Sequence, residues 1–275
     1  MARHLGAGRT KRSGWWRMVE SLDNPEVRVV LHVANTGAKP FFASATDGHD
    51  YWCKHPNGPQ GADAAACEVA AGVVGDALGA PIPKWSVLTV SEDLQGIYLD
   101  KGGYLLDDQP VFASRSEVVD IEVLESPGIL RHTEDDRNFE RIPLLFALWF
   151  LCNAEDIQFF YDQMNDFSIY SVDHAFWFGS QEAPWGFGDF KYSFGRPEVP
   201  FLKPGSIAGN WSGAIESVAR LDEHLAAAIR ARMPRAWDIG TTIPDEIADY
   251  VLGRKEYAIG QLEQLELDSE RRGER

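Results

Sequence analysis

The first third of the chain alternates short runs of β-branched and apolar residues with residues that favour turns. Runs of this kind, bounded by glycine, proline or aspartate, are typical of strands joined by short connections. The runs predict strands over residues 27–33, 41–46, 50–54 and 84–90. Between the third and fourth strands, small and apolar residues recur at helical spacing. This spacing predicts a helix over residues 62–78, which Gly79 and two nearby prolines would end.

The rest of the chain is dominated by helical patterns. The spacing of apolar residues predicts helices over residues 139–150, 214–232 and 244–272 and a short strand over residues 168–173. Gly253 is the position at which a break in the last helix could occur. Strands followed by helices favour an α+β fold with two lobes, hinged near residues 108–118. We therefore predict one lobe over residues 25–112 and a mainly helical lobe over residues 113–275.

The acidic composition limits the class of partner. The chain has 42 acidic and 26 basic residues and a formal net charge of −16. An acidic surface repels the phosphate backbone, so no direct binding to nucleic acid is expected. The longest apolar run extends only from Ile142 to Cys152, whereas a membrane-spanning helix needs about 20 residues. We expect a soluble protein with no membrane partner, whose ligand is small, metal-bridged or a protein.

Positive charge is concentrated at the start of the chain. Residues 1–17 hold five basic residues and no acid. We interpret residues 1–24 as a flexible basic arm that is either a solvated tail or a segment that pairs with an acidic surface.

The sequence lacks the signatures of several common sites. Its three cysteines show no CxxC spacing, which argues against a disulfide framework or a thiolate metal site and fits a reducing cytoplasm. The motifs GxxxxGK[ST], GxGxxG, HExxH and GxSxG are also absent, so P-loop, Rossmann, zincin and nucleophile-elbow sites lose their usual support.

A lysine and a glutamate are the first candidates for chemistry. Lys54 ends the third predicted strand, and Glu68 follows 14 residues later inside the predicted helix. A helix packed beside a sheet can offer such a carboxylate to a strand ammonium, and this pair is suited to holding nucleotide phosphates. The alternative is a surface lysine and a solvated glutamate. Glu68 nevertheless lies among small apolar residues, where a charged group is either paired or costly.

A second group of carboxylates follows the central helix. Glu155 and Asp156 come directly after the apolar run, and Asp173 ends the strand predicted over residues 168–173. Phosphoryl transfer needs one carboxylate to orient the attacking hydroxyl and another to hold Mg²⁺. Two loop carboxylates separated by a short hairpin can meet across a cleft. Taken singly, Glu155 or Asp156 could equally be a solvated acid at a helix end or turn.

These residues lie within segments that resemble the HipA-like kinases. The segments are Gly37-Ala-Lys-Pro-Phe-Phe, Asp47-Gly-His-Asp-Tyr-Trp-Cys-Lys54, His55-Pro-Asn-Gly-Pro-Gln-Gly61, Cys67-Glu-Val-Ala-Ala-Gly72, Leu78-Gly-Ala-Pro-Ile-Pro83, Leu151-Cys-Asn-Ala-Glu-Asp156 and Ser171-Val-Asp-His-Ala175. The resemblance covers roughly residues 27–180. It implies a two-lobed protein-kinase-like fold, in which an N-lobe with a small antiparallel sheet and one helix precedes a mainly helical C-lobe. It also implies an ATP-dependent, Mg²⁺-requiring kinase that acts on Ser or Thr of a protein.

The resemblance also implies a role for each candidate residue. Lys54 would bind the phosphates and Glu68 would anchor Lys54. Asp156, or Glu155, would be the catalytic base, and Asp173 would hold Mg²⁺. The loop over residues 35–40 would cover the phosphates and would contribute Gly37 and Lys39, although it has one glycine rather than a glycine-rich series.

The sequence departs from the family at one metal ligand. Kinases place an asparagine about five residues after the catalytic aspartate, but Phe160 and Tyr161 stand at these positions here. Asp162 or Asn165 would have to substitute. A nucleotide- or partner-binding module without turnover is therefore the alternative function, and a protein-interaction module that binds no nucleotide is the third.

Overall fold

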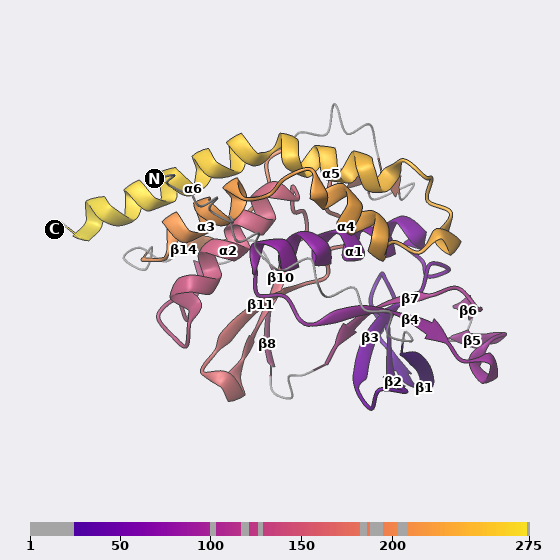
Figure 1. Ribbon diagram of the computed structural model, residues 1–275. Helices are drawn as coiled ribbons and strands as arrows, with labels where there is room; N and C mark the ends of the chain where they lie inside the picture. The colour runs from indigo at the N-terminus through magenta and orange to yellow at the C-terminus, as the bar shows by residue number, and fades with distance from the viewer. Residues whose placement is uncertain are drawn as a thin grey trace, which may run out of the picture.

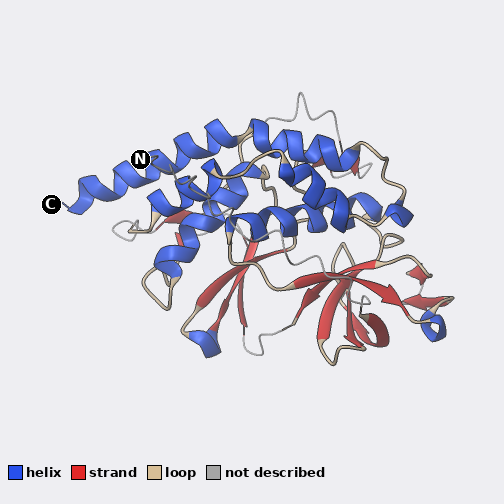
Figure 2. Cartoon of the chain, in the orientation of Figure 1, coloured by secondary structure: helices blue, strands red, loops and turns tan. Residues whose placement is uncertain are grey.

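Strands and helices occupy different sides of the molecule (Figures 1 and 2). The computed structural model describes residues 25–99, 103–116, 121–125, 129–181, 186–187, 195–202 and 208–273. The predicted basic arm, residues 1–24, lies outside the described residues. The α+β content that the hydrophobic pattern predicts is confirmed.

Five strands form a closed barrel. They are β1 (Glu26–Val33), β2 (Phe41–Ala45), β3 (Asp50–Lys54), β4 (Trp85–Val90) and β7 (Val111–Arg115), in the order β1-β2-β3-β7-β4. The first four match the strands predicted from sequence. Alternate apolar side chains such as Phe41, Cys53 and Leu88 are fully buried in the barrel core. The predicted boundary at residues 112/113 falls within β7, which pairs with β3 and β4 and is therefore part of the barrel.

Helix α1 (Gly61–Leu78) lies between the barrel and the other helices (Figure 1). It agrees with the predicted helix and ends at Gly79, whose φ of 72° is the left-handed conformation common after a helix. Most of its side chains are alanine, glycine or valine and are buried. Small side chains let neighbouring elements approach α1 from several directions, so this helix joins the larger hydrophobic core.

A second sheet lies beside the barrel (Figure 1). Its strands are β8 (Ile121–Glu125), β10 (Gln158–Asp162) and β11 (Ser168–Val172), with β10 in the centre. Strands β10 and β11 form an antiparallel hairpin in which Gln158 pairs with Val172 and Asp162 pairs with Ser168. The shorter strands are β5 (Ile97–Leu99), β6 (Tyr104–Leu106), β9 (Ile129–Leu130), β12 (Ser180–Gln181), β13 (Gly186–Phe187) and β14 (Phe201–Leu202).

The remaining helices pack against α1 and against one another. They are α2 (Asn138–Leu151), α3 (Trp211–Ala219), α4 (His224–Arg232), α5 (Ile243–Gly253) and α6 (Lys255–Gly273). The single helix predicted over residues 214–232 is wrong, because a turn separates α3 from α4. Within this turn the Asp222 carboxylate accepts the backbone N–H of His224, the first residue of α4. The predicted break at Gly253 is confirmed.

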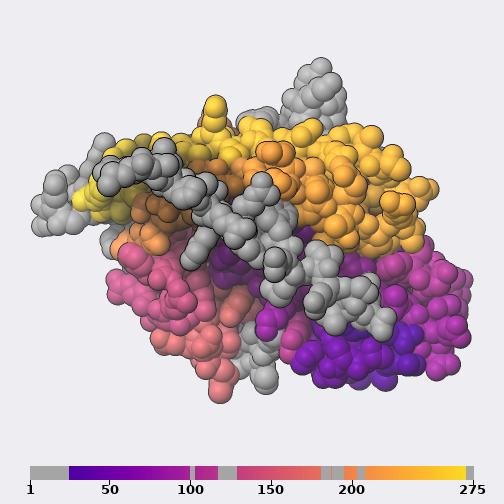
Figure 3. Space-filling model, viewed as in Figure 1, coloured from indigo at the N-terminus to yellow at the C-terminus, as the bar shows by residue number. Residues whose placement is uncertain are grey.

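Contacts between the α4–α5 region and the barrel region bring distant parts of the chain together. The indole N–H of Trp237 donates to the carbonyl oxygen of Pro110 at 2.7 Å. The guanidinium of Arg232 lies 4.6 Å from the ring centre of Trp85. In Figure 3 the surface of the last helices accordingly meets the surface of the barrel region. None of the described helices combines the length and apolarity needed to cross a membrane.

Candidate functional site

Three charged side chains from distant segments meet where the barrel, α1 and the β10–β11 hairpin come together. The Lys54 Nζ atom lies 2.5 Å from Glu68 Oε1 and 2.5 Å from Asp173 Oδ1. Lys54 and Glu68 are largely buried, whereas the Asp173 side chain is 34% exposed. The structure thus brings together Lys54, Glu68 and Asp173, three of the residues singled out from sequence.

Local structure explains why these side chains converge. Strand β3 alternates its side chains, so Cys53 points into the barrel and Lys54 points outward. Glu68 lies in the second turn of α1, where its small neighbours leave room for a carboxylate. Asp173 directly follows β11 and has a φ of 57°. Non-glycine residues rarely adopt this left-handed conformation, and such residues cluster at functional sites.

The charges of this cluster stabilise one another. Burial alone would lower the pKa of the Lys54 ammonium, but Asp173 and Glu68 together raise the pKa above its ordinary value. Burial would raise the pKa of Glu68, but Lys54 and His174 hold the pKa of that carboxyl well below its usual range. Lys54 and Glu68 are therefore charged at neutral pH. The placement of two carboxyl groups around one ammonium favours the approach of a further cation.

Glu68 is held by both the backbone and the side chain of His174, the residue that follows Asp173. The His174 backbone N–H donates to Glu68 Oε1 at 3.0 Å, and His174 Nδ1 lies 3.0 Å from Glu68 Oε2. On its other side, His174 Nε2 lies 3.3 Å from Ser171 Oγ, which accepts the indole N–H of Trp149. The position of Glu68 therefore depends on a buried chain of contacts that extends into the helical core.

A cavity of about 370 Å³ opens beside the cluster. Its lining residues come from the barrel, α1 and the hairpin: Ala34, Thr36, Pro40, Trp52, Lys54, Glu68, Gly72, Ile82, Pro83, Trp85, Phe112, Ser114, Gln158, Phe160, Val172, Asp173 and His174. Apolar and aromatic walls that surround a few charged groups are typical of a small-molecule site. The rings of Trp85 and Phe112 stack with their centres 6.0 Å apart.

The two candidates for the catalytic base lie outside this cavity. Glu155 and Asp156 are exposed, and neither is among the lining residues. The hairpin register nevertheless places them beside the end that carries Asp173, because Gln158 pairs with Val172. Asp156 has a φ of 49°, so a second aspartate near this end of the hairpin is also left-handed.

The proposed substitutes for the missing metal ligand lie at the other end of the hairpin. Asp162 lies four positions along the extended strand from Gln158, a distance of roughly 13 Å. The Asp162 side chain accepts the Met164 backbone N–H, and the Asn165 amide donates to Ser168 Oγ. Both residues therefore stabilise the distal turn, and the structure does not bring them to Asp173.

Sequence reasoning missed Gln158, whose side chain lines the cavity together with Asp173. Its Nε2 atom lies 3.5 Å from Asp156 Oδ2. A count of five residues forward from Asp156 passes over it. The signal that could have identified it is the hairpin register, counted backward from Asp173, because antiparallel pairing places the first residue of β10 opposite the last residue of β11.

The loop over residues 35–40 helps to line the cavity, but the lining residues are not the ones predicted from sequence. Thr36 and Pro40 line the cavity, but Gly37 and Lys39 are not among the lining residues. The loop is closed by a hydrogen bond from the Ala34 backbone N–H to the Pro40 carbonyl oxygen.

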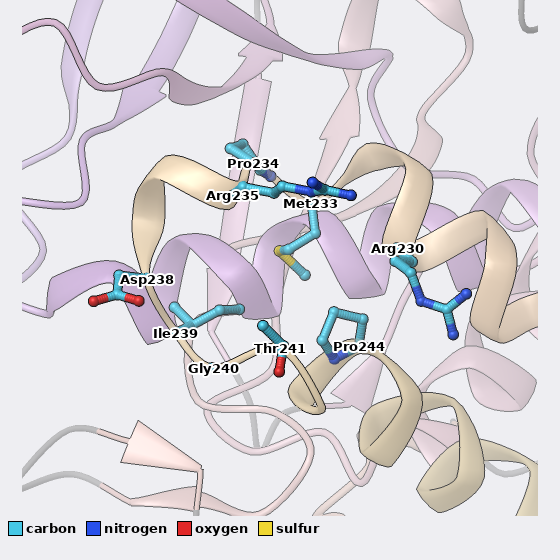
Figure 4. A pocket seen from close by; sticks show the side chains of 9 residues that line it. All are labelled: Arg230, Met233, Pro234, Arg235, Asp238, Ile239, Gly240, Thr241 and Pro244. Carbon is cyan, nitrogen blue, oxygen red and sulfur yellow. The ribbon is translucent and has the colours of Figure 1, made fainter.

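A second cavity, of about 390 Å³, lies between α4 and α5 (Figure 4). Its walls are apolar residues, two arginines, one aspartate and one threonine from residues 230–244. The Arg230 guanidinium already forms an ion pair with Asp245. None of these lining residues belongs to the first cavity, so the charged cluster and this pocket are separate features.

The chain was compared with solved structures, curated proteins and family models. Two crystal structures of a Golgi casein kinase are similar in structure: one is 12% identical with a TM-score of 0.49, and the other, with Mn/ADP bound, is 11% identical with a TM-score of 0.47. Each alignment covers 88% of this chain and 72% of the other chain. No curated protein matches the sequence. The family model of the HipA-like kinases matches residues 27–150, the region that holds the barrel, α1 and both Lys54 and Glu68, and this match confirms the resemblance to the HipA-like kinase family.

Proposed function

We propose that this protein is an ATP-dependent phosphotransferase that transfers the γ-phosphoryl group to Ser or Thr of a protein. The observation that carries the proposal is Lys54, held between Glu68 and Asp173 at the wall of the 370 Å³ cavity. A buried ammonium in a fixed position suits the binding of nucleotide phosphates, and the carboxylate beside it suits a cation that bridges them. The family match supports this kinase-like chemistry.

The cavity also has the character expected of a nucleoside site. Its volume lies within the range of about 300–1,000 Å³ that is usual for small-molecule pockets. Trp52 on β3 and Phe160 on β10 line it from two different sheets. Aromatic side chains on separate walls favour a planar ring between them. We therefore assign the aromatic part of the cavity to the base and the Lys54 end to the phosphates.

The residues present fit a hard divalent cation. Asp173 is partly exposed, and Gln158 adds an amide oxygen from the same cavity. Carboxylate and amide oxygens are the ligands that Mg²⁺ prefers. Asp173 and Gln158 would hold Mg²⁺, which would supply charge neutralisation for the phosphates.

The hydroxyl substrate would reach the site from solvent. Asp156, or Glu155 beside it, is exposed near the end of the hairpin that carries Asp173, so either can accept the proton of a hydroxyl on another protein. A carboxylate outside the nucleotide cavity fits a macromolecular substrate better than a small one, because the substrate need not enter the cavity.

A comparison of two aspartates on the same hairpin tests the proposal. Transfer of ³²P from γ-labelled ATP to the chain itself and to candidate proteins would be measured with wild type, Asp173→Asn and Asp162→Asn. We expect transfer to fall on the order of 100-fold in Asp173→Asn, the scale for loss of one electrostatic group at a transition state. Asp162→Asn removes a carboxylate from the distal turn and should leave transfer unchanged. Equal transfer by wild type and Asp173→Asn would remove Asp173 from the mechanism.

A nucleotide-binding protein without turnover is the second candidate. It is favoured by Phe160 and Tyr161 at the expected asparagine position and by the distal location of Asp162 and Asn165. Thermal unfolding in the presence of ATP and Mg²⁺, together with the transfer assay, distinguishes the two candidate functions. A ligand at 100 times its Kd stabilises a protein by about 2.7 kcal/mol, which for a chain of this size raises Tm by about 5 °C or more. Such a shift without transfer would support the second candidate, and no shift would contradict both.

A further inference from the structure

A fully buried arginine lies beneath the segment that carries Glu155 and Asp156. Arg254 lies at the junction of α5 and α6, and none of its surface is exposed. Its Nε–H donates to the carbonyl oxygen of Phe150 at 2.8 Å, and its Nη1 donates to the carbonyl oxygen of Gly195 at 3.1 Å. A buried charge is costly unless its environment satisfies it, so the location of this cation calls for an explanation.

The first of these carbonyls belongs to the end of α2. The last four carbonyls of a helix have no partner within the helix and need one from elsewhere. Here the carbonyl of Trp149 accepts the Ala154 N–H, and the carbonyl of Cys152 beyond the helix accepts the Phe178 N–H. Arg254 supplies the partner for Phe150. The guanidinium therefore fixes the point at which the chain leaves α2 toward Glu155 and Asp156.

The second carbonyl fixes the other side of the same segment. A β-carbon built on Gly195 would lie 3.3 Å from the side-chain nitrogen of Asn153, so the Gly195 backbone packs directly on that amide. Asn153 is 2% exposed and has a φ of 48°. By holding Gly195 and Phe150 at once, Arg254 confines Asn153 between two fixed backbone positions.

The surroundings of Arg254 also reach the predicted base. The guanidinium lies 4.8 Å from the ring centre of Tyr257 and 5.5 Å from that of Tyr250. Burial raises the pKa of Tyr250 to about 12, against the opposing effect of Arg254, and the charge of Glu155 contributes to the rise. Tyr250 thus contacts Arg254 and is close enough to Glu155 to respond to its charge.

We propose that Arg254 is a positioning residue, which holds residues 153–156 in place by clamping the Phe150 and Gly195 carbonyls from the α5–α6 junction. This inference rests on the proposed function, because it assigns Arg254 a role through Glu155 or Asp156. Arg254 holds the carbonyls of Phe150 and Gly195, and neither residue lines the nucleotide cavity. Its loss should therefore alter turnover and leave nucleotide binding intact.

The neighbouring Lys255 provides a matched control. Its ammonium donates to the carbonyl oxygens of Ala219 and Leu221 at the end of α3, away from residues 153–156. Lys255→Met removes a cation that binds helix-end carbonyls, as Arg254→Met does, but at a different helix. Arg254→Lys retains the charge and loses the planar fork that reaches two carbonyls at once.

Three measurements on the full chain would test the role of Arg254: hydrogen exchange of a peptide covering residues 150–157, kcat and KM for ATP, and the thermal midpoint. In Arg254→Met we expect at least tenfold faster exchange of this peptide and a tenfold or greater fall in kcat, with KM for ATP within twofold, because misplacement of about 1 Å can cost 100-fold in rate. Arg254→Lys should recover part of both losses. Lys255→Met should lower the thermal midpoint and leave exchange and kcat at wild-type values.

The outcomes separate this role from a general structural one and from failure of the proposed function. Unchanged exchange of residues 150–157 in Arg254→Met, or an equal loss of kcat in Lys255→Met, would overturn the proposal. If Arg254→Met does not fold, the same two readouts on Arg254→Lys decide. If wild type transfers no phosphate, the proposed function fails, whereas exchange of residues 150–157 still shows whether Arg254 holds the segment.

Discussion

At the scale of single residues, the site depends on how one ammonium is shared between two carboxylates. Lys54 contacts Glu68 on one side and Asp173 on the other, at 2.5 Å each. Glu68 is almost fully buried, so its charge depends on Lys54 and His174, whereas Asp173 is partly open to solvent. The buried partner therefore fixes the lysine, and the exposed partner is available for a ligand.

Glu68→Gln removes the buried charge and tests this division. Breaking a buried ion pair costs about 3–5 kcal/mol, and we expect a loss near the lower figure because Asp173 still pairs with Lys54. Lys54→Met should cost a similar amount, and the double variant should cost clearly less than the sum, since both changes remove one interaction. Urea denaturation measures the free energy of unfolding of all three variants.

An exposed ion pair on α3 serves as the control for the comparison of the Glu68 and Lys54 variants. Arg220 and Glu216 lie 3.8 Å apart on the helix surface, and exposed pairs contribute about 0–1 kcal/mol. Glu216→Gln should therefore change the free energy of unfolding by well under 1 kcal/mol. Additive losses for Glu68→Gln and Lys54→Met would show that the two side chains do not act as a pair.

At the scale of elements, helix α1 shapes one wall of the cavity because Gly72, which faces Trp85, has no side chain. A β-carbon on Gly72 would lie 2.4 Å from the ring of Trp85, so the indole rests directly on the helix backbone. The same indole donates its N–H to Asp76 and lies under the guanidinium of Arg232. Trp85 and Gly72 both line the 370 Å³ cavity, so the distance between β4 and α1 determines the position of this wall.

Substitution by alanine is expected to have different effects at two glycines of α1, Gly72 and Gly75. Gly72→Ala forces the indole of Trp85 to move, and overpacking of this kind costs about 1–3 kcal/mol, whereas the gain in helix propensity is only about 1 kcal/mol. Gly75→Ala meets the flexible end of Ile82 at 2.7 Å, which can shift. We expect Gly72→Ala to lower both stability and ATP affinity, and Gly75→Ala to change the free energy of unfolding by less than about 1 kcal/mol. Chemical denaturation and titration with ATP measure these effects, and wild-type ATP affinity in Gly72→Ala would contradict the assignment of the wall.

The sequence was sufficient for the elements whose pattern is local and insufficient for those set by pairing. Helix α1 and strands β1 to β4 follow from period and turn residues, and the spacing of Lys54 and Glu68 follows from them. Closure of the barrel and the register of β10 with β11 depend on contacts between distant segments, which periodicity does not encode. Counting along the chain therefore favours Asp162 as a metal ligand. The register instead places Asp162 at the far end of the hairpin and Gln158 at the end next to Asp173.

At the scale of the whole molecule, the hydrophobic cores do not follow the order of the chain. The smaller core fills the barrel, and the larger one joins α1 to the other helices and to the second sheet. Helix α1 lies between β3 and β4 in sequence, yet its buried face belongs to the larger core. The chain therefore crosses from the barrel into the larger core and back, and further contacts, such as Trp237 with Pro110, join the two regions.

This arrangement predicts that the barrel and the helices unfold together. Because the barrel strands can separate from the helices only if α1 leaves the larger core, we expect one cooperative transition in urea, with coincident midpoints by far-UV circular dichroism and tryptophan fluorescence. A fragment of residues 25–116, which retains the barrel strands and α1 but lacks the helices that cover α1, should show no cooperative transition, because the apolar face of α1 would be exposed. Two separate transitions in the full chain, or a cooperatively folded fragment, would show that the barrel is an independent unit and that α1 is stable without the helices that cover it.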